Sequence, residues 1–405
     1  MNQSSLLGIS GQAASPPYPH DALMQSPRTI ITPCSACRIP AEGILLILLL
    51  ACGCQSHRGG FFPIGLYGVD SKDYHAVRQA GFNLVTSPAS RSALDAAERE
   101  NLRVLAIPGT QAGAKFSAPA ARLAVTRFDA HPALWGWYLC DEPDLNDVAP
   151  EQLLLAHRFL KSIGAKRPTV TVIMSGGASL DYANITDIFM LDRYPIPWQP
   201  LSTFPQHLRM ARLALGPRKP LLAVIQAFDW EYDKTALGVE VPFRPPNFDE
   251  LRCMTYCALE SQVSGLMYFA NSMGDWHLPD HPETWSALQR VVREVHDRQP
   301  LFKAQSLWWP ARHRYVPKDS GWNESLQSSV SPSLWRVRHG NQAVPSGRYI
   351  VAVNTTGRRI EYQLRVSDLG IVQSAVVGEG RLLVATNGWF SDNFSPYGVH
   401  IYGPF

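Results

Sequence analysis

The sequence predicts a (β/α)8 barrel followed by an antiparallel β-sandwich. From residue 62 to residue 300, short apolar runs alternate with helical patterns, which indicates βαβ units and a parallel sheet. There are eight such runs, and eight units in a segment of this length match the size of a closed barrel. After residue 300 the strands alternate apolar and polar residues, which is typical of antiparallel sheets with one buried face.

The barrel strands are short and apolar, as expected of parallel strands that are covered on both faces. They are predicted at residues 63–69, 83–86, 103–107, 134–139, 169–174, 188–191, 221–225 and 265–270. The helices between and after them are predicted at 71–80, 90–100, 119–129, 150–163, 203–215, 248–261 and 284–298. The weakest unit lies between the fifth and sixth strands. A doubly wound open sheet is the alternative, but no glycine-rich nucleotide loop follows the first strand.

The C-terminal strands form the second predicted domain. Residues 348–354, 359–366, 381–385 and 397–402 read as strands, and serine and proline cluster before them at 317–333. We therefore divide the chain into a leader (1–58), a barrel (59–300) and a linker with a β-sandwich (301–405).

Composition excludes several classes of protein. The chain of 405 residues is 45% hydrophobic and 18% charged, which is typical of a globular protein. A net charge of +3, scattered along the chain, is too small for a nucleic-acid footprint, so no nucleic-acid partner is expected.

The leader carries an apolar run at residues 44–51, far shorter than the roughly 20 residues that cross a bilayer. It fits the core of a signal peptide. The run ends in Leu-Leu-Ala-Cys at Cys52, which resembles the bacterial lipobox. That resemblance implies lipidation of Cys52, export, and attachment to the cell envelope, at the outer membrane or facing the periplasm, through the lipid anchor alone. The alternative is a disordered or tail-anchored N-terminus, and in either case the leader is expected to lie outside the fold.

Polar residues stand where the predicted strands end, so a barrel would gather them in one cup. They are Asp70, Asp141, Glu142, Asp192, Tyr194, Gln226, Asp229, Trp230, Glu231, Asn271 and Trp276. Cleavage of a glycosidic bond needs one carboxylic acid to protonate the leaving oxygen and a second carboxylate as nucleophile or base. Crowded, partly desolvated carboxyls also raise one another's pKa, which favours such an acid. The structural alternative is that Asp141 caps the next segment and Glu142 pairs with an arginine.

The remaining polar and aromatic residues suggest how a ligand is held. Tyr194, Trp230 and Trp276 fall where stacking on a sugar ring would be useful, and Asp70, Gln226 and Asn271 are candidate partners for its hydroxyls. No metal or other cofactor is expected, because the histidines near the strand ends lack a persuasive ligand spacing.

The stretch HPALWGWYLCDEPD at residues 131–144 resembles the fourth strand of the large clan of retaining (β/α)8 glycoside hydrolases. It is especially similar to an uncharacterised bacterial, lipoprotein-type group that carries Asp-Glu-Pro. The similarity continues through 192–195, 219–228 and 250–256, and residues 394–402 resemble the last strand of an appended sandwich. The resemblance implies that Glu142 is the general acid/base, and that Asp141 stands where the clan usually has asparagine.

One position departs from the clan. Its nucleophile is a glutamate at the end of strand seven, where this chain has Gln226, an amide that cannot form a glycosyl ester. Three possibilities follow: Asp229 or Glu231 acts as nucleophile, Asp192 acts as base for an inverting attack by water, or the site binds without cutting. Inversion requires carboxyls about 6.5–9.5 Å apart and retention about 5–5.5 Å. The sequence thus suggests a hydrolase-like protein acting on an unidentified poly- or oligosaccharide, and alternatively a non-catalytic glycan-binding surface lipoprotein.

Overall fold

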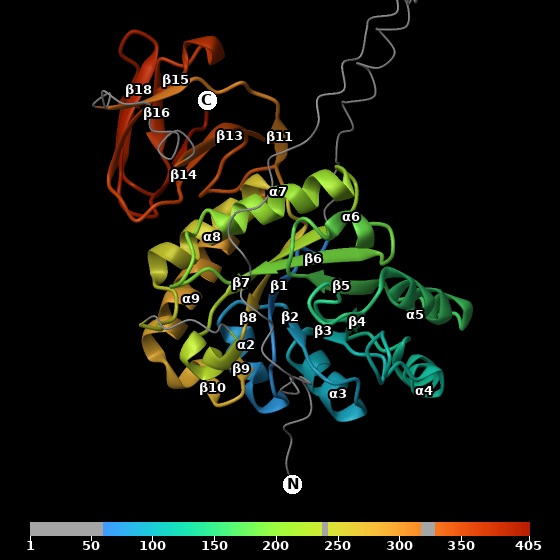
Figure 1. Cartoon of the computed structure of the whole chain (residues 1–405). Coiled ribbons are helices and arrows are strands. Elements are labelled where there is room, and N and C mark those ends of the chain that lie inside the picture. Colours follow the sequence, from blue (N-terminus) through green and yellow to red (C-terminus); the bar gives the residue numbers. More distant parts are fainter. Residues whose placement is uncertain (1–59, 237–241, 317–328) are drawn as a thin grey trace, which may run out of the picture.

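The computed structural model describes residues 60–236, 242–316 and 329–405, which form a barrel and a C-terminal β domain (Figure 1). The leader, including Cys52, lies outside the described residues. No helix in the described part of the chain is both long and apolar enough to cross a membrane.

Eight parallel strands close the barrel in chain order, and β8 pairs with β1. They are β1 (Ile64–Leu66), β2 (Leu84–Thr86), β3 (Arg103–Ala106), β4 (Leu134–Cys140), β5 (Thr169–Ile173), β6 (Ile188–Arg193), β7 (Leu221–Gln226) and β8 (Gly265–Phe269). The predicted fold class is confirmed. β1 is shorter than the predicted 63–69 because the chain turns at Gly68, where φ is 65°, and the Gly68 N–H donates to Thr86 Oγ1.

Helices surround the strands, and most begin and end within two residues of their predicted bounds. They are α2 (Tyr74–Gln79), α3 (Arg91–Arg99), α4 (Ala118–Phe128), α5 (Pro150–Ser162), α6 (Ser179–Tyr182), α7 (Thr203–Leu215), α8 (Phe248–Glu260), α9 (Pro282–Asp297) and α10 (Gln299–Phe302). The short 3₁₀ helices η2 (Ser71–Asp73), η3 (Trp230–Ala236) and η4 (Leu278–Asp280) and the hairpin β9 (Ser272–Met273) and β10 (Trp276–His277) lie in the connections. The weak unit is α6, which has one turn.

The C-terminal domain contains two antiparallel sheets. One has the order β11-β13-β14-β19-β16-β17 and the other β12-β15-β18. Their bounds are β11 (Gln305–Leu307), β12 (His313–Val316), β13 (Val330–Val337), β14 (Gly347–Asn354), β15 (Ile360–Arg365), β16 (Gln373–Val376), β17 (Arg381–Val384), β18 (Trp389–Phe394) and β19 (Val399–Tyr402), with η5 (Ser367–Leu369) between β15 and β16. The predicted linker therefore already contains strands, and β13 begins inside its serine- and proline-rich part.

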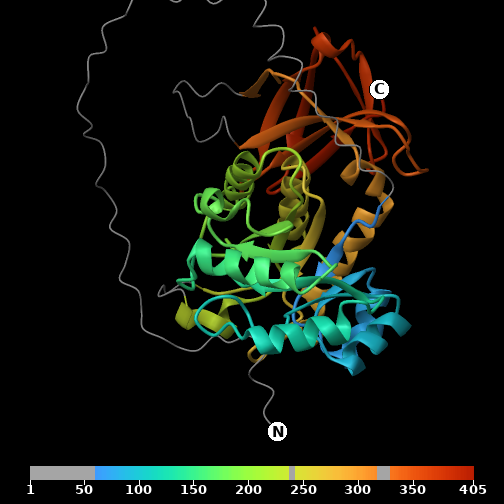
Figure 2. The same cartoon turned by 90° about the vertical axis from the view of Figure 1, so that its right-hand side faces the viewer.

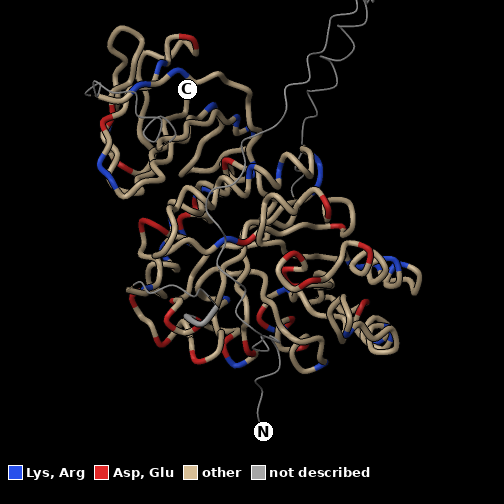
Figure 3. Tube along the Cα trace, viewed as in Figure 1, with Lys and Arg blue, Asp and Glu red and all other residues tan. Residues whose placement is uncertain are grey.

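The β domain packs on the barrel through α8 (Figures 1 and 2). Arg252 Nη1 donates to the Val399 carbonyl at 3.1 Å, and Cys253 Sγ lies 3.4 Å from the Asn354 carbonyl. Acidic and basic residues intermingle over both domains (Figure 3), as the scattered charge of the sequence indicates.

Candidate active site

The loop after β4 places Asp141 and Glu142 at the carboxyl end of the barrel strands, the end where barrels of this kind carry their sites. Glu142 has a φ of 40°, in the left-handed region that costs about 1–3 kcal/mol for a non-glycine residue. Neighbouring amides hold this conformation. Asn146 Nδ2 donates to the carbonyls of Asp141 and Glu142 at 3.0 and 3.2 Å, and Gln111 Oε1 accepts from the Asp141 N–H at 3.2 Å. A strained backbone at a single acidic residue is typical of functional sites.

Asp192 is the penultimate residue of β6, lies beside Glu142 and is only 3% exposed. Its Oδ2 accepts a hydrogen bond from Tyr194 Oη at 3.0 Å. Its buried Oδ1 has no amide, amine or hydroxyl donor within the described part of the chain. The Glu142 and Asp192 carboxyls share a side-chain hydrogen bond, so the protonated Glu142 is the further donor to Asp192.

Burial and like charge control the protonation of this pair. Burial, then the negative charges of Asp192 and Asp141, raise the pKa of Glu142 to about 11. Burial also raises the pKa of Asp192 to about 7, although interaction with the protonated Glu142 carboxyl and the Tyr194 hydroxyl counteracts that rise. At neutral pH, Glu142 is thus a protonated acid beside a group that is able to ionise.

Two tyrosines complete the base of the site, and sequence reasoning did not find them. Tyr138, on β4, donates from its hydroxyl to Asp141 Oδ1, and Tyr67 packs edge-on against the Tyr138 ring with centroids 6.1 Å apart. Burial raises the pKa of Asp141. A signal was available, because strand residues alternate between faces. Trp137 faces outward and bonds Asp129, so its neighbour Tyr138 must face the interior.

Aromatic rings line the site next to Asp192. Tyr194 stacks on Phe269 with centroids 5.3 Å apart, and Trp230 lies 4.8 Å from Phe228. The Trp230 indole N–H donates to the Tyr194 carbonyl at 3.3 Å. The structure therefore brings Tyr194 and Trp230 together, and both remain partly exposed.

Gln226 ends β7 and is fully buried. Its Oε1 accepts from the Ile196 N–H at 2.9 Å, while Nε2 donates to the carbonyls of Ile196 at 2.7 Å and Phe228 at 3.2 Å. Both amide hydrogens are thus used by the backbone. In this conformation Gln226 connects two loops and offers no donor to a ligand.

The other two acidic candidates, Asp229 and Glu231, lie in the connection that follows β7. Asp229 accepts from the backbone N–H of Glu231 at 2.9 Å, and Glu231 is exposed. Asp70 is also exposed and caps η2, accepting from the Lys72 N–H at 3.1 Å. The charges that most raise the pKa of Glu142 come from other residues, namely Asp192, Asp141 and Asp144.

The two candidates after β8 are buried beneath the loop that carries them. Asn271 Nδ2 lies 3.3 Å from Asp73 Oδ2, and its Oδ1 has no partner within the described ranges. Trp276 donates to the Ala270 carbonyl at 3.0 Å and stacks on His281 with centroids 3.9 Å apart. Trp276 thus supports the loop rather than presenting a face to a ligand.

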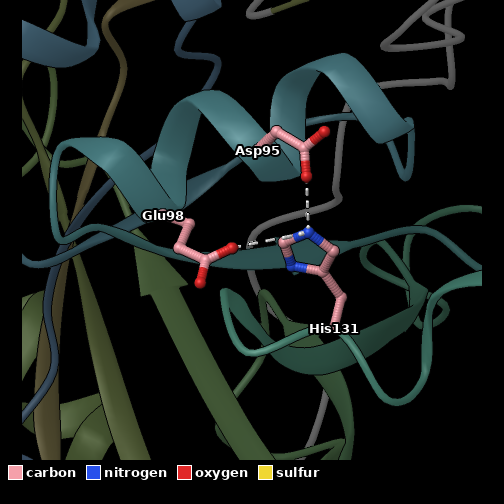
Figure 4. Close-up of side chains that lie close together, drawn as sticks. All are labelled: Asp95, Glu98 and His131. Carbon is pink, nitrogen blue, oxygen red and sulfur yellow. Dashed lines mark hydrogen bonds and ion pairs between the residues drawn. The ribbon is translucent and has the colours of Figure 1, made fainter.

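A separate acidic cluster lies near the amino end of β4, away from this site (Figure 4). His131 Nδ1 accepts from the Ala133 N–H at 3.2 Å, so in the neutral ring the proton is on Nε2. Nε2 lies 3.0 Å from Asp95 Oδ1 and 3.9 Å from Glu98 Oε2. The hydrogen bond from His131 lowers the pKa of Asp95. This geometry fits a hydrogen bond from a neutral imidazole that joins α3 to the segment before β4.

No protein-family profile and no curated protein matches the sequence. Solved structures match its fold. A catalytic mutant of Gan42B, a GH42 β-galactosidase from G. stearothermophilus, has a TM-score of 0.54 at 8% identity, covering 85% of this chain and 98% of that one. AmyP in complex with maltose has a TM-score of 0.50 at 10% identity, covering 82% and 88%. A β-galactosidase from the psychrophilic Marinomonas ef1 matches at 13% identity with a TM-score of 0.45, and there the alignment spans 60% of this chain and 62% of that one. The chain therefore has the fold of TIM-barrel glycoside hydrolases.

Proposed function

We propose that the protein is a glycoside hydrolase that acts on an oligo- or polysaccharide, with Glu142 as general acid/base and Asp192 as the second carboxylate. The observation that carries the proposal is the pairing of these groups. Glu142 holds its proton at neutral pH beside the buried Asp192, at the carboxyl end of the strands. Maltose bound to AmyP, a protein of the same fold, is consistent with a carbohydrate substrate.

The proximity of the two carboxyls favours double displacement. A side-chain hydrogen bond joins Glu142 and Asp192, so the two carboxyls must separate for either reaction. Retention needs a separation of only about 5–5.5 Å, whereas inversion needs about 6.5–9.5 Å. Asp192 would attack the anomeric carbon while the bond to the leaving oxygen breaks and that oxygen takes the Glu142 proton. Water, deprotonated by Glu142, would then attack the same carbon and release Asp192. The Tyr194 hydroxyl orients Asp192 for the first step.

A non-catalytic glycan-binding protein is the second candidate. The observation that favours it is Gln226, which occupies the clan's nucleophile position and is committed to backbone hydrogen bonds. In this alternative the polar residues at the strand ends and the rings of Tyr194 and Trp230 bind a sugar without cleaving it.

Digestion of a glycan panel tests the proposal. We expect the wild-type chain to release product, and Glu142→Gln and Asp192→Asn each to lower kcat by at least a hundredfold. The matched controls Glu151→Gln and Asp181→Asn change exposed carboxyls and should retain activity. Proton NMR of the first-formed anomer should show retention. Glycan binding without cleavage by the wild type would instead establish the binding protein.

We further propose export and lipid anchoring through Cys52, which rest on the leader sequence alone.

A further inference from the structure

A cavity of about 460 Å³ lies where α9 of the barrel approaches the β domain (Figure 2). Phe248, the first residue of α8, adjoins the wall formed by α9, and turns of the β domain at residues 343 and 377–378 form the opposite wall. The charged residues that line the cavity are Arg290, Arg293, Glu294, Asp297 and Arg298. None of them belongs to the candidate active site. The volume is in the range of small-molecule sites, which are common at the junction of two domains.

Glu294 is already paired within the protein. Arg252 Nε donates to both of its carboxylate oxygens, at 2.9 and 3.0 Å, and Arg298 Nη1 donates to its Oε1. The Tyr256 hydroxyl donates to the same oxygen at 2.8 Å. One carboxylate thus faces two guanidinium groups, which leaves one positive charge uncompensated.

Two more arginines in the cavity have no partner of opposite charge. Arg290 and Arg293 are exposed and form no ion pair with any described residue. Asp297 lines the same cavity, and its carboxylate forms no ion pair within the described ranges either. Together with Arg252 and Arg298, four guanidinium groups therefore surround the cavity against two carboxylates. The excess of two positive charges favours a ligand with two negative charges.

Two of these guanidinium groups are held in place and keep N–H groups free. The Arg290 guanidinium carbon lies over the Phe248 ring, 3.8 Å from its centroid, and its N–H groups have no acceptor among the described residues. Arg298 is fixed through Nη1, whereas its Nη2 lies against Gly378. A β-carbon at Gly378 would come within 2.5 Å of Nη2, so glycine keeps this side of the guanidinium open. Arginines held in this way bind oxyanions through paired hydrogen bonds.

We infer that this cavity binds a sugar that carries a sulfate or phosphate ester. The ester group offers three terminal oxygens, enough for the three arginines that line the cavity, whereas a carboxylate offers only two. The choice of a sugar rests on the carbohydrate substrate proposed above, and the site would hold a part of that glycan away from the carboxyls of the barrel.

The rest of the cavity suits the sugar ring. A volume of about 460 Å³ leaves room beside the ester group. Asp297 offers carboxylate oxygens that accept from sugar hydroxyls, and charge-assisted hydrogen bonds of this kind are the strong ones. Ala343 and Val377, on the opposite wall, are apolar and can pack against the carbon atoms of the ring. The arginines and the opposite wall thus bind different parts of one ligand.

Calorimetric titration of the full chain provides the test. The probes are the 6-sulfates and 6-phosphates of glucose, galactose and N-acetylglucosamine. Each is compared with its parent sugar, with glucuronic and galacturonic acid, and with inorganic sulfate and phosphate. We expect at least one ester to bind ten times more tightly than its parent sugar and than the inorganic ion, and added salt should weaken this binding. The stronger of the two ester types identifies the group that the site recognises.

Variants locate the site. Arg290→Gln combined with Arg293→Gln should lower the affinity for the ester at least tenfold. The matched control combines Arg122→Gln with Arg127→Gln, two exposed arginines of α4, of which Arg122 also lies over a phenylalanine ring, and it should retain the affinity. Ala343→Asp places a negative charge on the opposite wall and should weaken binding as well. All these residues are exposed, so each variant should melt close to the wild-type temperature.

Several outcomes would overturn the inference: equal affinity for an ester and its parent sugar, equal or tighter binding of a uronic acid or an inorganic ion, unchanged affinity in the double arginine variant, or no binding of any probe. The outcomes also separate the two proposals. Hydrolysis of the glycan panel without ester binding would sustain the hydrolase and refute this site. Ester binding that depends on Arg290 and Arg293, with no hydrolysis of any glycan, would do the reverse.

Discussion

Gln226 gives the sharpest prediction, because sequence comparison and structure lead to opposite expectations for the change Gln226→Glu. If Gln226 were merely a lost nucleophile, the change would restore a carboxylate to the site. The structure instead gives both amide hydrogens to the carbonyls of Ile196 and Phe228. A carboxylate cannot donate to either carbonyl, so we expect a less stable protein and no gain in activity.

The size of the effect follows from the contacts. Two buried carbonyls without donors cost about 1–3 kcal/mol each, or about 4 kcal/mol together. Protonating the new carboxyl would restore one bond. At pH 7, however, the carboxyl must hold a proton well above its ordinary pKa of about 4.3. At 1.36 kcal/mol per pKa unit this costs about as much as the two lost hydrogen bonds together. At pH 4 the proton is available in the unfolded chain as well, so only one lost bond remains, about 1–2 kcal/mol.

Urea denaturation at pH 4 and pH 7 measures this difference. The raised native pKa of the new carboxyl means that the destabilisation grows as pH rises above about 4.3. Gln206→Glu is the matched control, because Gln206 is exposed in the first turn of α7 and should shift stability by less than about 0.5 kcal/mol. Wild-type stability of Gln226→Glu at pH 7, or a covalent glycosyl adduct at position 226 with faster turnover, would show that this side chain faces the substrate.

Three further predictions concern other parts of the chain. Because the native pKa of Asp192 is raised to about 7 from an ordinary value of about 3.9, its burial lowers stability as pH rises from 4 to 7. Asp192→Asn should remove this loss in urea titrations, and unchanged pH dependence would contradict the assigned pKa. Arg244→Ala leaves the fully buried Glu250 carboxylate without its bidentate partner, so we expect a loss of about 3 kcal/mol by the same method, and little change for the exposed Arg218→Ala. Cys52→Ala should move the protein from the detergent phase to the aqueous phase in Triton X-114 partitioning, and identical partitioning would refute lipidation at this residue.

The barrel could be predicted because its buried parallel strands are continuous apolar runs. β7 was predicted to within one residue. β6 was predicted to end at 191, but the ladder continues through Asp192 and Arg193, which pair with Val224 and Ile225 of β7. Polar residues at the end of a strand resemble loop residues in the sequence. The apolar pattern therefore underestimates the length of a strand at the end that carries the site.

The β domain was harder to predict because its strands are defined by partners far along the chain. β13 begins within a serine- and proline-rich segment, and Pro332 lies in its ladder opposite Ala352. β11 pairs with β13 only from Leu334 to Arg336, so Pro332 lies beyond the end of that pairing, where the β11 side of β13 is open. Proline is tolerated at such an open edge, and local composition does not reveal it.

Part of the site was recognisable from residue types at the strand ends. Glu142 and Asp192 were both proposed, and the structure places them together. Tyr67 and Tyr138 escaped notice because a tyrosine in an apolar strand resembles any core residue. The role of Gln226 was hidden as well, since its main partner, Ile196, is 30 residues away.

Two exchanges relative to the resembled clan together relocate the negative charge of the cup. The carboxylate expected at the end of β7 is replaced by Gln226, and the amide expected before Glu142 is replaced by Asp141. The number of carboxyls is therefore conserved, but the charge moves from β7 toward β4 and β6. There Asp141 raises the pKa of both Glu142 and Asp192. A standard nucleophile on β7 would not need this arrangement, whereas a site that pairs Glu142 with Asp192 gains from it, because the negative charge of Asp141 helps Glu142 to keep its proton.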